Sequence, residues 1–225
     1  MSTTTISIAK DDVDQRRLPV YLLIDTSLSM DGDPIEAVRQ GMRNLVSELR
    51  GDPQALETAF LSVITFDSEA RQVAPLADLV AFQEPNLQVS GATSLGAALR
   101  TLRACIDSEV RKNSPTQKGD YRPIVFLMTD GEPTDSWEKD ADELKRARPA
   151  NIIACGCGPN VNVATLKRIT EIVVMMTNYN PDTFKAFFKW VSQSIKTTST
   201  KLVATPDAGA PIDLPPPPAT LQIIP

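Results

Sequence analysis

Two short, largely apolar runs, each followed at once by an aspartate, most strongly constrain how this chain can fold. Residues 18–24 read LPVYLLI and stop at Asp25, and residues 123–129 read PIVFLMT and stop at Asp130. Continuous runs of this kind are typical of parallel strands that are buried on both faces. A chain that contains such strands needs helices to cover both faces of its sheet.

Segments with helical periodicity separate the expected strands. After the first strand, Asp33 and Pro34 are a typical N-cap and first helical residue, and Gly51 is a typical helix end. Between them, apolar residues recur at three- and four-residue spacing; they are Ile35, Val38, Met42, Leu45, Val46 and Leu49. Further strands are expected at residues 60–66, 70–76, 151–156 and 172–176, and further helices at about 95–106, 139–147, 163–169 and 181–196.

The alternation of strands and helices predicts an α/β fold. We expect a doubly wound, Rossmann-like, mostly parallel six-stranded sheet with helices on both faces. Residues 70–76 follow the second strand so closely that they should return as a hairpin and form one antiparallel edge strand. In such sheets, binding sites form at the carboxyl ends of the strands, beside the point where the strand order reverses.

Composition divides the chain into three parts. We expect an N-terminal extension at residues 1–17, one folded domain at 18–196, and a Pro-rich flexible tail at 197–225 that lacks packing periodicity. The first ten residues lack the features of a signal peptide, and no apolar run approaches the roughly 20 residues that span a bilayer. Three cysteines, an odd number, do not suggest a disulfide framework. These features predict a cytoplasmic protein without membrane insertion.

The net charge and the absence of histidine exclude several functions. The 23 basic residues against 28 acidic ones give a net charge of −5, which argues against a nucleic-acid partner. The sequence contains no histidine. Catalysis by Ser-His-Asp or Cys-His groups and zinc sites of the HExxH type are therefore excluded.

Five oxygen-bearing side chains are expected at one edge of the sheet. Asp25, Ser27 and Ser29 alternate after the first strand, so they can point to the same side. Thr93 lies in a Gly-Ala-Thr loop, and Asp130 follows a later strand. Carboxylate and hydroxyl oxygens are hard ligands that suit one divalent cation, Mg²⁺ above all and also Mn²⁺ or Ca²⁺, rather than zinc or copper. Taken singly, each motif also fits a helix cap or a turn.

This ligand set predicts binding rather than catalysis. Two carboxylates at most neutralise a dication, and hydroxyls add no further charge. An open coordination position would therefore attract an Asp or Glu carboxylate of a partner protein. Such binding needs no nucleophile and no general base, so we expect a protein that is not an enzyme.

The run from Val20 to Gly32, VYLLIDTSLSMDG, resembles the opening of von Willebrand factor type A domains. The five candidate ligands match the metal-ion-dependent adhesion site of that family one for one, and the resemblance extends from about Pro19 to Ile195. It implies that Ser27, Ser29 and Thr93 lie closest to the ion. The two aspartates would then bind the ion directly or through water.

Residues 91–99, GATSLGAAL, and Phe66 at the end of the second strand are similar to the TerY-like proteins of bacterial tellurite-resistance and stress gene clusters. The nearest members of that group are encoded beside a protein kinase and a phosphatase. The resemblance therefore implies a scaffold in phosphorylation signalling, with the kinase and the phosphatase as possible partners.

Two residues are candidates for the partner-binding rim. Asp31 is expected as a solvated loop residue near the metal site, and Trp137 follows Asp130 closely enough to contact a partner, although it fits a core role equally well. Two other functions remain open. One is a Mg²⁺-dependent phosphoryl-transfer enzyme, although such enzymes need a second acid where this chain has Ser27. The other is a structural subunit whose metal only stabilises loops.

Overall fold

The computed structural model describes residues 16–158, 161–176, 180–204, 212 and 214–224. Strands and helices alternate along this chain, as predicted. The strands are β1 (Leu18–Asp25), β2 (Ala59–Phe66), β3 (Ala70–Asp78), β4 (Ile124–Thr129), β5 (Asn151–Gly156), β6 (Ile172–Met176) and β7 (Leu221–Ile224). The helices are the 3-10 turn η1 (Leu28–Met30), α1 (Asp33–Arg50), α2 (Pro53–Thr58), α3 (Leu95–Glu109), α4 (Glu138–Ala147), α5 (Val163–Ile169) and α6 (Pro181–Ala204).

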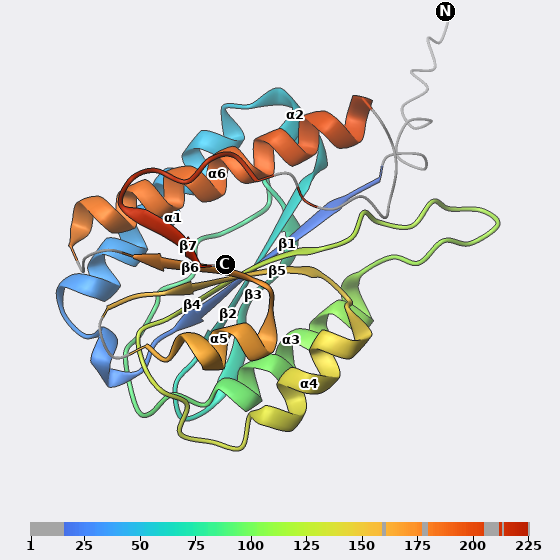
Figure 1. Ribbon diagram of the computed structural model, residues 1–225. Helices are drawn as coiled ribbons and strands as arrows, with labels where there is room; N and C mark the ends of the chain where they lie inside the picture. Colours follow the sequence, from blue (N-terminus) through green and yellow to red (C-terminus); the bar gives the residue numbers. More distant parts are fainter. Residues whose placement is uncertain (1–15, 159–160, 177–179, 205–211, 213, 225) are drawn as a thin grey trace, which may run out of the picture.

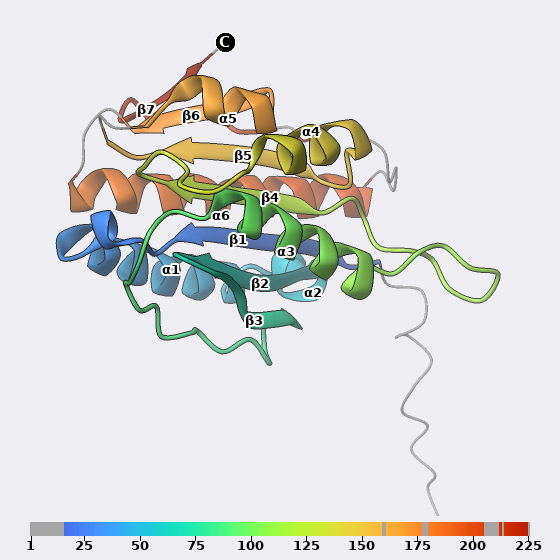
Figure 2. The same cartoon turned by 90° about the horizontal axis from the view of Figure 1, so that it is seen from below.

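The seven strands form one sheet in the order β3-β2-β1-β4-β5-β6-β7. Five strands are parallel, whereas β3 pairs antiparallel with β2 and β7 pairs antiparallel with β6. The order reverses between β1 and β4, so the gap beside these two strands is the switch point of the doubly wound fold. Figure 2 shows the parallel strands pointing the same way, with all their carboxyl ends at one edge.

Helices cover both faces of the sheet. Helices α1, α2 and α6 lie on one face, and α3, α4 and α5 lie on the other (Figure 1). Strand β1 contributes Val20, Leu22 and Ile24 to the first core and Tyr21 and Leu23 to the second, all of them buried. Apolar residues on both faces explain why this strand reads as a continuous apolar run rather than an alternating one.

Helices α1 and α6 approach each other closely at Gly41. A Cβ atom at this position would overlap the ring of Phe188 in α6. The ring of Phe188 packs edge-to-face on Phe187 at 5.5 Å. A glycine in the interior of a helix costs conformational entropy, and here the cost is offset by the close contact between the two helices.

The expected six-stranded sheet with a single antiparallel edge is wrong in one respect, because residues 221–224 add a seventh strand at the other edge. The predicted tail also begins too early, since α6 continues from Lys196 to Ala204. Leu221 is buried against the core, and the indole of Trp190 donates to the carbonyl of Pro215 at 2.8 Å. A four-residue strand is too short to show a period, so only its pairing with β6 identifies it. Residues 205–211 of the predicted tail lie outside the described residues.

Residues 1–15 of the predicted extension also lie outside the described residues. Arg17, at its end, forms a bidentate ion pair with the buried carboxylate of Asp120. The three cysteines are free and buried. Within the described part of the chain, no helix combines the length and the apolar character that crossing a membrane requires.

Candidate metal centre

The carboxyl ends of β1 and β4 meet at the switch point. These strands are paired in register from Val20 with Ile124 to Ile24 with Met128, so Asp25 and Thr129 follow as the next pair of positions. Asp130 comes directly after β4. The parallel register thus brings together two aspartates that are far apart in the sequence.

Asp25 is completely buried at the base of the site. Its Oδ1 accepts a hydrogen bond from the backbone N–H of Ser27 at 2.9 Å, and its Oδ2 accepts one from the Thr129 hydroxyl at 2.6 Å. Burial raises the pKa of the Asp25 carboxyl to about 6, although the hydrogen bonds from Ser27 and Thr129 act in the opposite direction. The carboxylate is therefore held in a fixed orientation in a place where its negative charge is costly.

The hydroxyls of Ser27 and Ser29 lie between the two aspartates. Their oxygens are hydrogen bonded at 3.0 Å, and the Ser29 hydroxyl donates to Oδ1 of Asp130 at 2.7 Å. Ser27 precedes η1 and Ser29 lies within it, and this tight turn keeps both hydroxyls on one side. The side chains of Asp25, Ser27 and Ser29 therefore converge as predicted, but the turn η1 brings Ser29 to the others rather than the alternation of an extended strand.

The loop that carries Thr93 is tied to the first strand loop through its backbone. Ser90 N–H donates to the carbonyl of Thr26 at 2.9 Å, and Leu28 N–H donates to the carbonyl of Gly91 at 3.2 Å. Gly91 has a φ of +65°, and a Cβ atom there would run into Ser68. This position therefore requires glycine both for its conformation and for the space beside it.

Thr93 lies beside the other hydroxyls across Gly131. A Cβ atom at Gly131 would lie 3.4 Å from the Thr93 hydroxyl oxygen and 4.0 Å from that of Ser29. The backbone carbonyl of Thr93 also accepts from Thr134 N–H at 2.9 Å, which joins this loop to the segment after β4. The structure thus brings all five predicted side chains to one place at the edge of the sheet.

The spacing of the oxygens fits a small, hard cation. Octahedral Mg²⁺ has ligands at about 2.0–2.1 Å, so neighbouring ligands are about 2.9 Å apart. The separations between Ser27 and Ser29, 3.0 Å, and between Ser29 and Asp130, 2.7 Å, agree with this value. No three His, Cys, Asp or Glu side chains gather as metal ligands among the described residues, so hydroxyls supply the rest of the set.

Two residues that support the site were not predicted. Thr129 orients Asp25 through the 2.6 Å hydrogen bond, and it directly precedes the predicted ligand Asp130 in the sequence. Asp135 accepts from the backbone N–H groups of Gly96 and Ala97, both at 3.0 Å, and so caps the helix that follows Thr93. A cap provided by a distant segment has no signature in the local sequence.

The predicted rim residues have different surroundings. Asp31 is exposed next to the site, whereas Trp137 is only half-buried and precedes α4, where the guanidinium of Arg168 lies 5.6 Å above its ring. Trp137 also packs against the core under α3 and α4. Asp33 is not the N-cap of α1 as predicted, because Gly32, with a φ of +80°, occupies that position and Asp33 lies in the first turn.

The sequence profile of the von Willebrand factor type A domain matches residues 20–193. The chain belongs to this family. Domains of the family generally act as adhesion or scaffold modules that bind other proteins, and their metal-ion-dependent adhesion site holds a divalent metal. The family assignment agrees with the resemblance that the strand-end motifs indicated.

Solved structures with the same fold share few residues with this type A domain. The von Willebrand factor type A protein of Catenulispora acidiphila is 20% identical, with a TM-score of 0.61, over 80% of this chain and 43% of that one. A proximal thread matrix protein of the mussel byssus with a zinc-occupied MIDAS motif is 20% identical, with a TM-score of 0.58, over 83% of this chain and 47% of that one. The pilus adhesin SpaC of Lactobacillus rhamnosus GG is 15% identical, with a TM-score of 0.62, over 84% of this chain and 31% of that one.

A curated relative is the uncharacterized protein sll0103 of Synechocystis sp. It is 33% identical to this type A domain over 133 residues, which make up 55% of this chain and 28% of that protein. The chain therefore spans about a quarter of this relative, and it spans less than half of each of the three solved proteins.

Proposed function

We propose that this type A domain is a metal-ion-dependent protein-binding module. Asp25, Ser27, Ser29, Thr93 and Asp130 would hold one divalent cation, and an Asp or Glu carboxylate of a partner protein would complete its coordination. The observation that carries the proposal is the chain of close oxygens from Ser27 through Ser29 to Asp130, at 3.0 and 2.7 Å. Their spacing is that of neighbouring ligands around one small cation.

The surroundings and the charges of the five candidate ligands suit them to binding a partner's carboxylate. Asp25 is buried and fixed by Ser27 and Thr129, so it stays in position when the site exchanges its partner. Three of the five ligands are neutral hydroxyls, which leave the site with little negative charge to repel an incoming acid. When bound, the ion supplies a Lewis-acidic position for that acid.

We propose Mg²⁺ as the ion, with Mn²⁺ and Ca²⁺ as alternatives, because hard oxygen ligands suit all three. The mussel byssus protein has zinc in its metal-ion-dependent adhesion site (MIDAS), so such a site can hold zinc. The oxygen ligands of this chain nevertheless favour Mg²⁺ over zinc on chemical grounds. Zinc therefore belongs among the ions to be tested.

We infer that the domain binds rather than catalyses. Both carboxylate oxygens of Asp25 accept hydrogen bonds, which makes this aspartate a poor nucleophile for phosphoryl transfer. The position two residues later, where such enzymes carry a second acid, is occupied by Ser27.

We further propose a cytoplasmic scaffold in a bacterial tellurite or stress response, with a protein kinase and a phosphatase as partners. This narrower proposal rests on the similarity of Phe66 and residues 91–99 to TerY-like proteins. The three free, buried thiols suit a reducing compartment.

The proposal is tested by calorimetric titration of Mg²⁺, Mn²⁺, Ca²⁺ and Zn²⁺ into the purified protein and into Thr93→Ala. We expect at least an about tenfold loss of ion affinity in the variant, because it lacks one ligand. Ser136→Ala, an exposed hydroxyl in the neighbouring loop, serves as the matched control and should bind like wild type. Equal ion affinity in Thr93→Ala and wild type would exclude this ligand set.

Partner binding is tested separately by a pull-down from native lysate with Mg²⁺ or with EDTA. Captured proteins should be lost in EDTA and with Asp25→Ala. Capture that persists in EDTA would contradict the metal-dependent mechanism. Unchanged capture by ligand variants that only melt at a lower temperature would favour the purely structural role of the metal.

A further inference from the structure

A groove of about 420 Å³ opens at the amino-terminal end of the sheet, opposite the candidate metal centre. It lies between the end of α4 and the starts of β5 and β6. Its floor is apolar and includes Ile152 and Ile172, and its charged residues are one acid, Glu171, and three bases, Arg122, Lys145 and Arg148. The groove thus combines an apolar floor with a carboxylate among cations.

The charged groups of this groove are available to a partner. Glu171 is exposed and forms no hydrogen bond or ion pair within the described part of the chain. Arg122 donates only to the carbonyl of Arg148, at 2.6 Å, and neither arginine has a carboxylate partner among the residues that the structure describes. Glu171, Arg122 and Arg148 are therefore not used to stabilise this domain through ion pairs.

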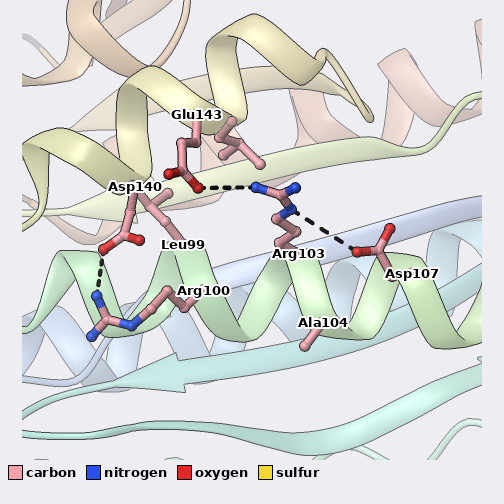
Figure 3. Close-up of a pocket in the computed structure, with 8 residues that line it drawn as sticks. Leu99, Arg100, Arg103, Ala104, Asp107, Asp140 and Glu143 are labelled. Carbon is pink, nitrogen blue, oxygen red and sulfur yellow. Dashed lines mark hydrogen bonds and ion pairs between the residues drawn. The ribbon is translucent and has the colours of Figure 1, made fainter.

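A second groove, between α3 and α4, differs in this respect. There Arg100 pairs with Asp140, and Arg103 pairs with Glu143 at 3.2 Å and with Asp107 at 4.0 Å (Figure 3). Because the charged side chains of this groove already form ion pairs with one another, few of them are available to bind a partner. The groove that contains Glu171 is therefore the stronger candidate for a partner-binding surface.

The rim of the metal centre has the complementary features. Leu28 lies between the two serine ligands in the sequence, and its apolar side chain is 64% exposed. Asp31 and Glu132, in the segments that follow Ser29 and Asp130, are exposed, and neither forms an ion pair with a residue that the structure describes. An apolar projection flanked by acids fits an apolar groove flanked by cations.

We propose that a second copy of this chain is a partner of the metal centre. Glu171 of one copy would provide the carboxylate, Leu28 of the other would enter the apolar groove, and Arg122 and Arg148 would face Asp31 and Glu132. This inference rests on the proposed function, because the metal is one of its contacts. It goes further in naming the carboxylate donor and the surface around it.

The two surfaces lie at opposite ends of the parallel strands (Figure 2). Contact between them is therefore heterologous, and a pair of bound copies keeps one free metal centre on one copy and one free groove on the other. Such contacts build rings or open chains rather than closed symmetric dimers. Assembly should then grow with protein concentration instead of stopping at two copies.

The test is sedimentation velocity of the full chain over a range of concentrations, with Mg²⁺ or with EDTA. We expect assemblies larger than a dimer in Mg²⁺ and monomers in EDTA. Glu171→Gln should weaken self-association by about tenfold or more, because it removes the carboxylate that binds the ion. Glu84→Gln, which changes an exposed acid outside both surfaces, is the matched control and should assemble like wild type.

A mixture of two variants distinguishes the loss of one contact surface from a failure of the variant to fold. Glu171→Gln keeps an intact metal end and Thr93→Ala keeps an intact groove, so each alone should be monomeric whereas the mixture should form 1:1 dimers. If wild type binds Mg²⁺ by calorimetry but remains monomeric, self-association is refuted while the proposed function stands. If no ion binds, the proposed function fails as well. Unchanged assembly of Glu171→Gln would also overturn the inference.

Discussion

The buried carboxyl of Asp25 makes the stability of the metal-free protein depend on pH in a predictable direction. Its pKa is raised by burial from 3.8 to about 6 in the folded state. A raised pKa means that the folded protein binds this proton more tightly than the unfolded chain does. The resulting stabilisation is fully present below the unfolded pKa and is lost as the pH rises through the folded one.

The size of the effect follows from the shift. A shift of about 2 units corresponds to about 3 kcal/mol, since each unit corresponds to 1.36 kcal/mol. Asp25 is completely buried, so solvent screening does not reduce this value. Part of the change lies below about pH 4, where other carboxyls also titrate, which leaves about 2 kcal/mol to be measured between about pH 4 and pH 8.

The perturbation is Asp25→Asn, which keeps the shape and can still accept from Ser27 N–H. The assay is urea unfolding of wild type and variant in EDTA across that pH range. We expect the stability of wild type relative to the variant to fall by about 2 kcal/mol as the pH rises. In saturating Mg²⁺ wild type should regain stability at high pH, whereas the variant should not.

A constant difference between wild type and Asp25→Asn across the pH range in EDTA would refute the reasoning. It would mean that the folded carboxyl titrates as it does in the unfolded chain. A difference that grows with pH in EDTA would contradict the sign, because it would require a lowered pKa.

Three further variants test the packing and the support of the site. Gly41→Val should destabilise the protein by about 2 kcal/mol in urea unfolding, because its side chain would overlap the ring of Phe188; an unchanged midpoint would contradict the close helix contact. Removal of residues 214–225 should lower the free energy of unfolding by at least about 2 kcal/mol in the same assay, because Leu221 loses its buried contacts and β6 loses its partner strand. Equal stability of the shortened protein would show that β7 contributes nothing. Asp135→Ala should cost about 1 kcal/mol and also weaken ion affinity in calorimetry, because the cap of the helix after Thr93 is lost. Ser136→Ala is its control, and a stability loss without any change in ion affinity would limit Asp135 to a structural role.

The sequence allowed the central part of the fold and the candidate ligands to be predicted for physical reasons. Strands buried on both faces are continuous apolar runs, and the carboxyl ends of parallel strands must lie at one edge. Asp25 and Asp130 mark two such ends, and Ser27 follows Asp25 in an extended conformation, whereas Ser29 reaches the site through the turn η1. Local patterns and one topological rule were therefore enough to place these residues near each other.

Features that depend on distant partners could not be predicted in this way. Strand β7 shows no pattern of its own and is defined by its pairing with β6. Asp135 caps a helix that begins some 40 residues earlier in the chain, at a sequence separation of 39 from Gly96. Gly32 takes the N-cap position in place of Asp33, because only the positive φ of the glycine allows the chain to turn there.

The candidate ligands come from parts of the chain that are widely separated, with a sequence separation of 101 between Ser29 and Asp130. They converge only when β1 and β4 are paired, so the unfolded chain presents no comparable set of oxygens to an ion. Ion binding would then be coupled to completion of the whole sheet, and the melting temperature should rise with the logarithm of free ion concentration above the dissociation constant. A hundredfold excess over that constant would add about 2.7 kcal/mol to the free energy of unfolding. The cellular concentration of the ion would in this way set how long the domain survives between synthesis and degradation.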